Sequence, residues 1–423
     1  MNAKKTAKTG AIAALAAALG IFIAAGCDTL LDAIDPEPPK PVQGETIKIG
    51  LIFPADPSYP ARAFLQGAWI ALNEINDSGG ILGKQVELIV RDNLGTDPYP
   101  TAASTIDTAR DLIINEGVTA IVGPVFSTNS IALGQALTQA GETTPFIPAS
   151  TSPIVTQSYT HTALVSANIP LHSTILSDFA RSGLKADTAA ILAQEEDAYS
   201  QLLTSTFMEL FEADGGTVVS AETYAVETVD FSANVETLLA GGSDVCFLTS
   251  FPPAVPLIID QARAAGYEGV FIGANGWDVQ AAFYSVLDDN SVLDGSYFTT
   301  DFSPDNPFIS PGPPAVPPQF AAVYEASYGV PADSLAGNGF DAMSVLAQAI
   351  QTAGANGAEP TDDAILQALT AIRGYRGATE ISHFDENRLA VKDLIIMRIQ
   401  DGASAIHDLW DNPLKGSDPP ASD

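Results

Sequence analysis

Cysteine and histidine are scarce in this chain. Two cysteines, Cys27 and Cys246, occur among 423 residues, so at most one disulfide is possible. The four histidines stand far apart, at positions 161, 172, 383 and 407, and no His-Glu-x-x-His motif is present. We therefore expect no metal site and no other cofactor.

Basic residues are also few. The chain has 18 Lys and Arg against 51 Asp and Glu, which gives a formal net charge of −33. A surface this acidic repels phosphate groups, so the composition argues against binding to nucleic acid or to acidic membranes through a basic face.

Catalytic motifs are missing as well. No Gly-x-Ser-x-Gly sequence occurs, and Gly79–Lys84 is one residue short of a phosphate-binding P-loop and lacks the following Ser or Thr. Gly337–Ala342 fits Gly-x-Gly-x-x-Ala, but no strand precedes it, so a loop that opens a helix is the better interpretation. We expect that the protein is not an enzyme.

The first 26 residues have the pattern of an export signal. Three lysines are followed by the apolar run Ala11–Ala25, and small residues precede Cys27 as in a bacterial lipobox. This pattern predicts cleavage before Cys27 and its lipidation, which leaves Cys246 as a small core residue. A plain signal peptide or an inner-membrane anchor is the alternative. Residues 27–45 are rich in proline and predict an extended tether.

Strand and helix signals alternate from residue 47 onward. Residues 47–54 predict a buried strand, 61–76 a helix, 81–93 a turn and a second strand, and 101–115 a second helix. The alternation resumes after residue 188. It predicts an α/β fold with parallel sheets and helices on both faces.

The stretch Gly123–Thr151 is the centre of the functional prediction. A buried strand at 118–122 leads to Ser127 and a helix, and a second short strand ends in Ala149-Ser150-Thr151. Parallel strands end at the same edge of a sheet, so we expect Ser127 and Thr151 to lie side by side. Hydroxyls and helix N-terminal amides there would bind a small anion such as a carboxylate. Ordinary helix caps are the alternative.

Several segments, in order, resemble type I periplasmic binding proteins of the Leu/Ile/Val class. The resemblance covers about residues 47–408, with Arg388 and Ala61 where the family usually has glycine. The matching positions include Gly67-Ala68, Leu72, Glu74-Ile75-Asn76, Gly79-Gly80, Leu82-Gly83, Gly339–Ala349 and His383–Gly402.

The resemblance implies two Rossmann-like lobes joined by a three-segment hinge, with the ligand between them. Residues 46–166 and 300–380 are expected in lobe 1, residues 167–299 and 381–410 in lobe 2, and 411–423 in a flexible tail. The crossings are expected near Leu164–Asn168, Phe298–Asp301 and Thr379–His383. The Pro-rich stretch 301–319 is interpreted as a surface loop, with a lid or a partner contact as alternatives.

The resemblance also implies the site. Ser127 would bind a carboxylate, flanked by Thr151 and its neighbour Ser150, and Ala149 would offer its carbonyl to an ammonium group. The expected aromatic residues are Tyr199, Phe251 and Tyr59, although each could instead pack within a lobe.

One position departs from the amino-acid binders of this class. Asn275 stands where an acid usually pairs the ammonium group, so an amide or a carboxylate without an amine is an alternative ligand. Asp278 could replace that acid, or it could cap a helix.

These features predict a monomeric substrate-binding lipoprotein that is exported and anchored through Cys27. It would bind a small polar solute by hinge closure and deliver it to an ABC permease. A ligand sensor that signals to a regulator is the alternative.

Overall fold

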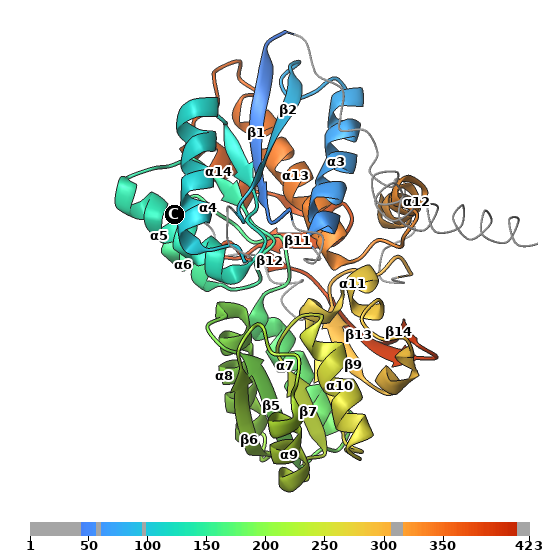
Figure 1. The fold of residues 1–423 in the computed structure, drawn as a ribbon. Helices are drawn as coiled ribbons and strands as arrows, with labels where there is room; N and C mark the ends of the chain where they lie inside the picture. Colours follow the sequence, from blue (N-terminus) through green and yellow to red (C-terminus); the bar gives the residue numbers. More distant parts are fainter. Residues whose placement is uncertain (1–43, 56–60, 95–98, 306–315, 413–423) are drawn as a thin grey trace, which may run out of the picture.

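Two separate sheets, one parallel and one mostly parallel, form the frame of the molecule (Figure 1). The computed structural model describes residues 44–55, 61–94, 99–305 and 316–412. Several predictions lie outside the described residues: the leader, Cys27, most of the tether, Tyr59, residues 306–315 and residues 413–423. Within the described ranges, no helix has the length and apolar character needed to cross a membrane.

The first sheet is buried between two layers of helices. Its four parallel strands are, in order, β2 (Gln85–Asp92), β1 (Thr46–Phe53), β3 (Ala120–Val122) and β4 (Phe146–Ile147). One face packs against α3 (Arg62–Asp77), α12 (Val316–Tyr328), α13 (Ser334–Ala353) and α14 (Asp362–Thr370). The other face packs against α4 (Ala102–Arg110) with its extension η1 (Asp111–Glu116), α5 (Ser127–Ala140) and α6 (Ile154–Ser158).

The second sheet is larger and gains its last strands from the end of the chain. Its order is β14 (Ala403–Trp410), β13 (Leu394–Gln400), β9 (Tyr297–Thr300), β8 (Val270–Gly273), β7 (Val245–Leu248), β5 (Thr188–Gln194) and β6 (Thr217–Tyr224). Strands β9 to β6 are parallel, whereas β13 and β14 form an antiparallel hairpin beside β9.

Helices cover both faces of this sheet too. One core contains side chains of α7 (Ile169–Asp178), its extension η2 (Phe179–Gly183) and α8 (Ala198–Ala213). The other contains side chains of α9 (Ser232–Gly241), α10 (Ala254–Ala264), η3 (Asn275–Trp277), α11 (Gln280–Tyr284) and η4 (Asn290–Leu293). Cys246 is fully buried in this core, as its sequence context predicts.

The separate cores define two lobes, and the chain passes between them three times. Of the described residues, lobe 1 comprises 44–55, 61–94, 99–165, 302–305 and 316–391, and lobe 2 comprises 167–300 and 393–412. The crossings are residues 165–167, 300–302 and 391–394. The predicted fold class is therefore confirmed: an α/β chain with parallel sheets in a two-lobe arrangement.

The third crossing is a correction to the sequence analysis. We expected it at Thr379–His383, with residues 381–410 in lobe 2. Instead Ile381 and Phe384 of β11 (Glu380–Phe384) belong to the lobe 1 core. β11 lies between β10 (Arg373–Arg376) and β12 (Ala390–Val391) in a small antiparallel sheet, so the chain leaves lobe 1 about ten residues later.

Arg388 shows how the turn before β12 is held. Its φ of 64° lies in the left-handed region, which explains why glycine is usual there in the resembling family. The Arg388 guanidinium donates to the carbonyls of Thr162 and Thr156, and the Leu164 amide donates to the Arg388 carbonyl at 3.0 Å. These bonds join the turn to the chain just before the first crossing and favour the unusual backbone.

Two glycines allow α3 and α13 to approach closely. A Cβ added at Gly67 would lie 1.9 Å from the Ala336 carbonyl oxygen, and one at Gly339 would lie 1.9 Å from the Phe64 carbonyl oxygen. The contact is reciprocal and involves backbone on both sides, so neither helix can move away without loss of core packing.

We predict that Gly67→Ala lowers the free energy of unfolding by about 2 kcal/mol, because the new methyl group meets backbone that cannot move aside. Urea unfolding followed by circular dichroism measures this. Gly241→Ala is the matched control, because the nearest atom to a Cβ there is a Val219 methyl group at 3.2 Å and no backbone atom stands in its way. Equal stability of the two variants would contradict the close helix contact.

Candidate ligand-binding site

The lobe 1 part of the site is a pair of hydroxyls. Ser127 begins α5 just after β3, and Ser150 follows β4. Their Oγ atoms lie 2.9 Å apart, and both residues are buried. The two turns therefore meet as predicted, but Ser150, not Thr151, lies against Ser127. The Thr151 carbonyl instead accepts a hydrogen bond from the Ile169 amide at 2.9 Å, at the start of α7.

The Ser127 hydroxyl is not a helix cap. Phe126 is the N-cap residue of α5, and it supplies no side-chain cap. The Ser152 amide donates to Ser150 Oγ at 3.2 Å, and the Ser150 hydroxyl can in turn donate a hydrogen bond to Ser127 Oγ. Ser127 then keeps a proton to donate to a bound anion, beside the positive end of α5.

The lobe 2 part of the site is built around Tyr199, in the first turn of α8. Its hydroxyl donates to Asn275 Oδ1 at 3.0 Å and accepts from the Gly276 amide at 2.9 Å. Its ring stacks on Phe251, with centroids 4.8 Å apart. The structure thus brings together the predicted residues Tyr199, Phe251 and Asn275. Burial raises the pKa of the Tyr199 hydroxyl above its usual value, so it is neutral at physiological pH.

The two parts touch at the N-termini of α5 and α8. Thr128 Oγ1 donates to Asp197 Oδ1 at 3.3 Å and accepts from the Ala198 amide at 3.0 Å. Beside this contact, the Phe126 ring meets Phe251 edge-on, with centroids 5.8 Å apart. We call these contacts the seam. Ser127 of lobe 1 and Tyr199 of lobe 2 are only 3% and 4% exposed, so both side chains are shielded from water.

Three seam residues were missed in the sequence analysis: Phe126, Thr128 and Asp197. Asp197 could have been found locally, since an Asp three residues before Ser200 is a helix-start pattern. Its Oδ2 does accept from the Ser200 amide at 2.8 Å. The contact of Asp197 with Thr128 joins segments 69 residues apart, and no local pattern marks it.

Asp278 lies on the hinge side and does not cap a helix, so that interpretation is wrong: Val279 is the N-cap residue of α11 and supplies no side-chain cap. The Asp278 oxygens accept from Thr300 Oγ1 at 2.6 Å and from Gln280 Nε2 at 3.0 Å. Ser334 of lobe 1 donates to the Asp278 carbonyl at 3.1 Å. Asp278 therefore connects lobe 2 to the second crossing and to α13.

Ala149 is also near the hinge. Its carbonyl was predicted to accept a hydrogen bond from an ammonium group of the ligand. It already accepts one from Ser166 Oγ at 3.3 Å, so one of its two lone pairs is used. Among the described residues, no group of three or more His, Cys, Asp or Glu side chains is placed to hold a metal ion.

A model of the family described as periplasmic binding protein matches residues 46–404. The chain belongs to this family. The resemblance noted in the sequence is thus confirmed.

Several members of the periplasmic binding protein family are similar to this protein over most of its chain. A Leu/Ile/Val-binding protein of Rhizobium johnstonii is 26% identical over 323 residues, which cover 74% of this chain and 81% of that protein. A leucine-binding protein of Thermotoga maritima is 27% identical, with a TM-score of 0.77 over 87% of this chain and 99% of that one. The isoleucine complex of a Streptococcus pneumoniae branched-chain amino acid binding protein shares the fold, with a TM-score of 0.75, 24% identity and coverage of 86% and 99%.

Two buried acids, Asp333 of lobe 1 and Asp278 of lobe 2, lie close to each other near the second crossing. Burial and the nearby Asp278 raise the pKa of Asp333, the N-cap residue of α13, to about 8, and burial raises the pKa of Asp278 to about 6. A raised carboxyl pKa stabilises the folded protein at low pH, and this stabilisation is lost as pH rises from about 4 to about 8.

We predict that Asp333→Asn makes the melting temperature less dependent on pH between about 4 and 8 and raises it at pH 8, because asparagine keeps the bond to the Ala336 amide but cannot ionise. Thr361→Asn, which exchanges the cap of α14 without removing a carboxyl group, is the control. If the melting temperature of Asp333→Asn depends on pH as that of the unmodified protein does, the Asp333 carboxyl is not a source of the pH dependence.

Proposed function

We propose that this protein is the substrate-binding lipoprotein of an ABC transporter and that it holds a small polar solute between its lobes. The observation that carries the proposal is the pairing of Ser127 and Ser150 in lobe 1 opposite Tyr199 and Phe251 in lobe 2, with direct contact between the lobes beside them. A solute that touches both parts favours the closed arrangement over an open one.

The chemistry of the two sides favours a solute with a carboxylate and an apolar body. Ser127 and the first turn of α5 offer hydrogen-bond donors and a positive helix end to the carboxylate. The stacked rings of Tyr199 and Phe251 offer an apolar surface to the rest. The relatives named for leucine, isoleucine and valine support an amino acid of this kind.

The ammonium group is the open part of the specificity. Asn275 brings no negative charge, and its Oδ1 already accepts from Tyr199. A solute without an amine, such as a branched carboxylate or amide, would therefore lose less binding free energy here than in a site that has an acid at this position. The proposed ligand class is branched-chain amino acids together with branched carboxylates that lack the amine.

Isothermal calorimetry with leucine, 4-methylpentanoate and leucinamide tests this, because the second lacks the amine and the third lacks the carboxylate. We expect leucine and 4-methylpentanoate to bind and leucinamide to fail. Ser127→Ala should weaken binding by about 1–3 kcal/mol through the loss of a hydrogen bond to a charged group.

Ser205→Ala is the matched control, since the Ser205 hydroxyl is exposed on α8 and bonds only to the Leu202 carbonyl. Equal binding of all three compounds, or unchanged affinity in Ser127→Ala, would remove Ser127 from the site. Binding should also raise the melting temperature of the folded protein.

Export and anchoring are tested separately. We predict that Cys27→Ser moves the protein from the membrane fraction to the soluble extract when cells are fractionated, because the modified cysteine would be its membrane attachment. Cys246→Ser keeps the predicted lipobox and is the control. Continued membrane association of Cys27→Ser would contradict a lipid anchor as the sole attachment.

A further inference from the structure

A polar residue stands at the changeover of each crossing. Ser166 lies between Val165 of the lobe 1 core and Ala167 of the lobe 2 core. In the second crossing, Asp301 follows β9 and precedes Phe302 of the lobe 1 core, and in the third, Lys392 follows β12 and precedes β13. All three residues are buried.

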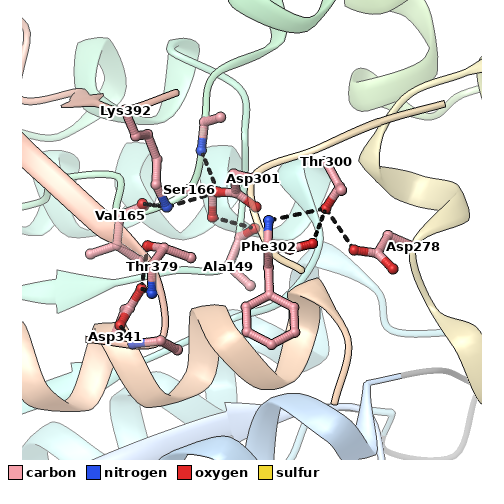
Figure 2. Close-up of polar contacts among 12 residues, drawn as sticks. Ala149, Val165, Ser166, Asp278, Thr300, Asp301, Phe302, Asp341, Thr379 and Lys392 are labelled. Carbon is pink, nitrogen blue, oxygen red and sulfur yellow. Dashed lines mark hydrogen bonds and ion pairs between the residues drawn. The ribbon is translucent and has the colours of Figure 1, made fainter. Parts of the chain in front are cut away.

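Asp301 and Lys392 form an ion pair that binds the first crossing between them. Lys392 Nζ lies 2.8 Å from Asp301 Oδ2, and each side chain is 1% exposed. Lys392 Nζ also donates to the Val165 carbonyl at 2.9 Å, and the Ala167 amide donates to Asp301 Oδ2 at 3.0 Å. Figure 2 shows that residues of the three crossings meet in one hydrogen-bonded cluster. We call this cluster the pivot.

The pivot is connected to the candidate site. Ser166 lies between Val165 and Ala167, the two residues whose backbone the ion pair holds. It donates to the Ala149 carbonyl. Ala149 is followed by Ser150, the partner of Ser127. On the other side, Thr300 precedes Asp301 and donates to Asp278 (Figure 2). The backbone that positions the Ser150 hydroxyl therefore rests on the pivot.

The energetics favour a geometric role over a purely stabilising one. Removal of two charges from water costs so much that a buried ion pair is often no more stabilising than apolar side chains of similar size, whereas one buried charge without its partner is strongly destabilising. Burial alone would raise the pKa of Asp301, but Lys392 and the Ala167 amide hold that pKa below its usual value, so the Asp301 carboxyl is ionised. What the pair adds is fixed direction, since both ions bond to specific backbone atoms.

We propose that Asp301 and Lys392 are positioning residues for solute binding: they hold the three crossings together as one pivot, so that the lobes turn about a fixed line and close with the Ala149–Ser150 edge in register with Tyr199. The effect of the ion pair on solute affinity rests on the proposed function, whereas its effect on the motion of the lobes does not.

A double-mutant cycle separates positioning from stability. Asp301→Asn and Lys392→Met each leave one buried charge and should lower the melting temperature strongly. The double variant has no lone charge and should recover most of that stability. We expect its affinity for leucine to stay weaker by about tenfold, because the crossings are no longer held together. Recovery of affinity along with stability would overturn the proposal and leave the pair a purely structural role.

A measurement without ligand keeps the test independent of the proposed function. Spin labels on Gln135→Cys in α5 and Glu209→Cys in α8, both exposed positions, report the distance between the lobes by double electron–electron resonance. We expect a narrow distribution of distances in the protein that keeps the Asp301–Lys392 ion pair and a clearly broader one in the double variant. Equal distributions would overturn the pivot even if leucine binds. Failure of leucine to bind the unmodified protein, with a broader distribution in the variant, would reject the ligand class alone.

Arg181→Met with Asp187→Asn is the matched control. These residues form an ion pair at 2.8 Å wholly within lobe 2, away from the crossings. Its removal should change neither the distance distribution nor the affinity. A broadening equal to that of the Asp301 and Lys392 double variant would mean that loss of any ion pair loosens the lobes, which would overturn the proposal.

Discussion

Parallel strands end at one edge of their sheet, and the candidate site depends on this constraint in both lobes. Ser127 and Ser150 follow neighbouring strands of lobe 1. Tyr199, Phe251 and Asn275 follow β5, β7 and β8, which are consecutive in the second sheet. Each group therefore comes from a separate part of the chain and is positioned by a rigid strand. Because the two edges face each other across the seam, neither lobe alone holds the complete set.

Two sets of contacts between the lobes differ in kind. At the seam they are a hydroxyl near a carboxylate and two rings edge-on, which water and a small rotation can replace at low cost. At the pivot they are a buried ion pair with bonds to backbone, whose separation would expose lone charges to an apolar interior. The seam is thus suited to separate when the lobes open, whereas the pivot is suited to stay intact.

The sequence predicted what local patterns encode. The alternation of strands and helices, the hydroxyls after β3 and β4, and the aromatic residues of lobe 2 all follow from short segments and from the family resemblance. Ser150 in place of Thr151 is a difference of one residue in a turn, where a side chain's direction depends on backbone angles that composition does not specify.

The errors arose where distant segments meet. Asp301 and Lys392 are 91 residues apart, so nothing near either residue indicates a partner. The helix-cap interpretation of Asp278 was wrong because its partners Thr300 and Ser334 come from other elements. The third crossing was placed too early because β12 has only two residues and belongs to lobe 1 through its pairing with β11.

The late return of the chain to lobe 2 has a consequence for the order in which the lobes can be built. Lobe 1 needs α13 to cover α3, and lobe 2 needs β13 and β14 to cover the open side of β9. A chain that emerges from its N-terminus therefore lacks part of lobe 1 until α13 has emerged and part of lobe 2 until the C-terminal hairpin is available, and its long-range contacts make assembly slow. Completion of the fold waits for the C-terminal hairpin, and a chain cut before Leu394 would leave β9 as an unprotected edge open to pairing with other chains.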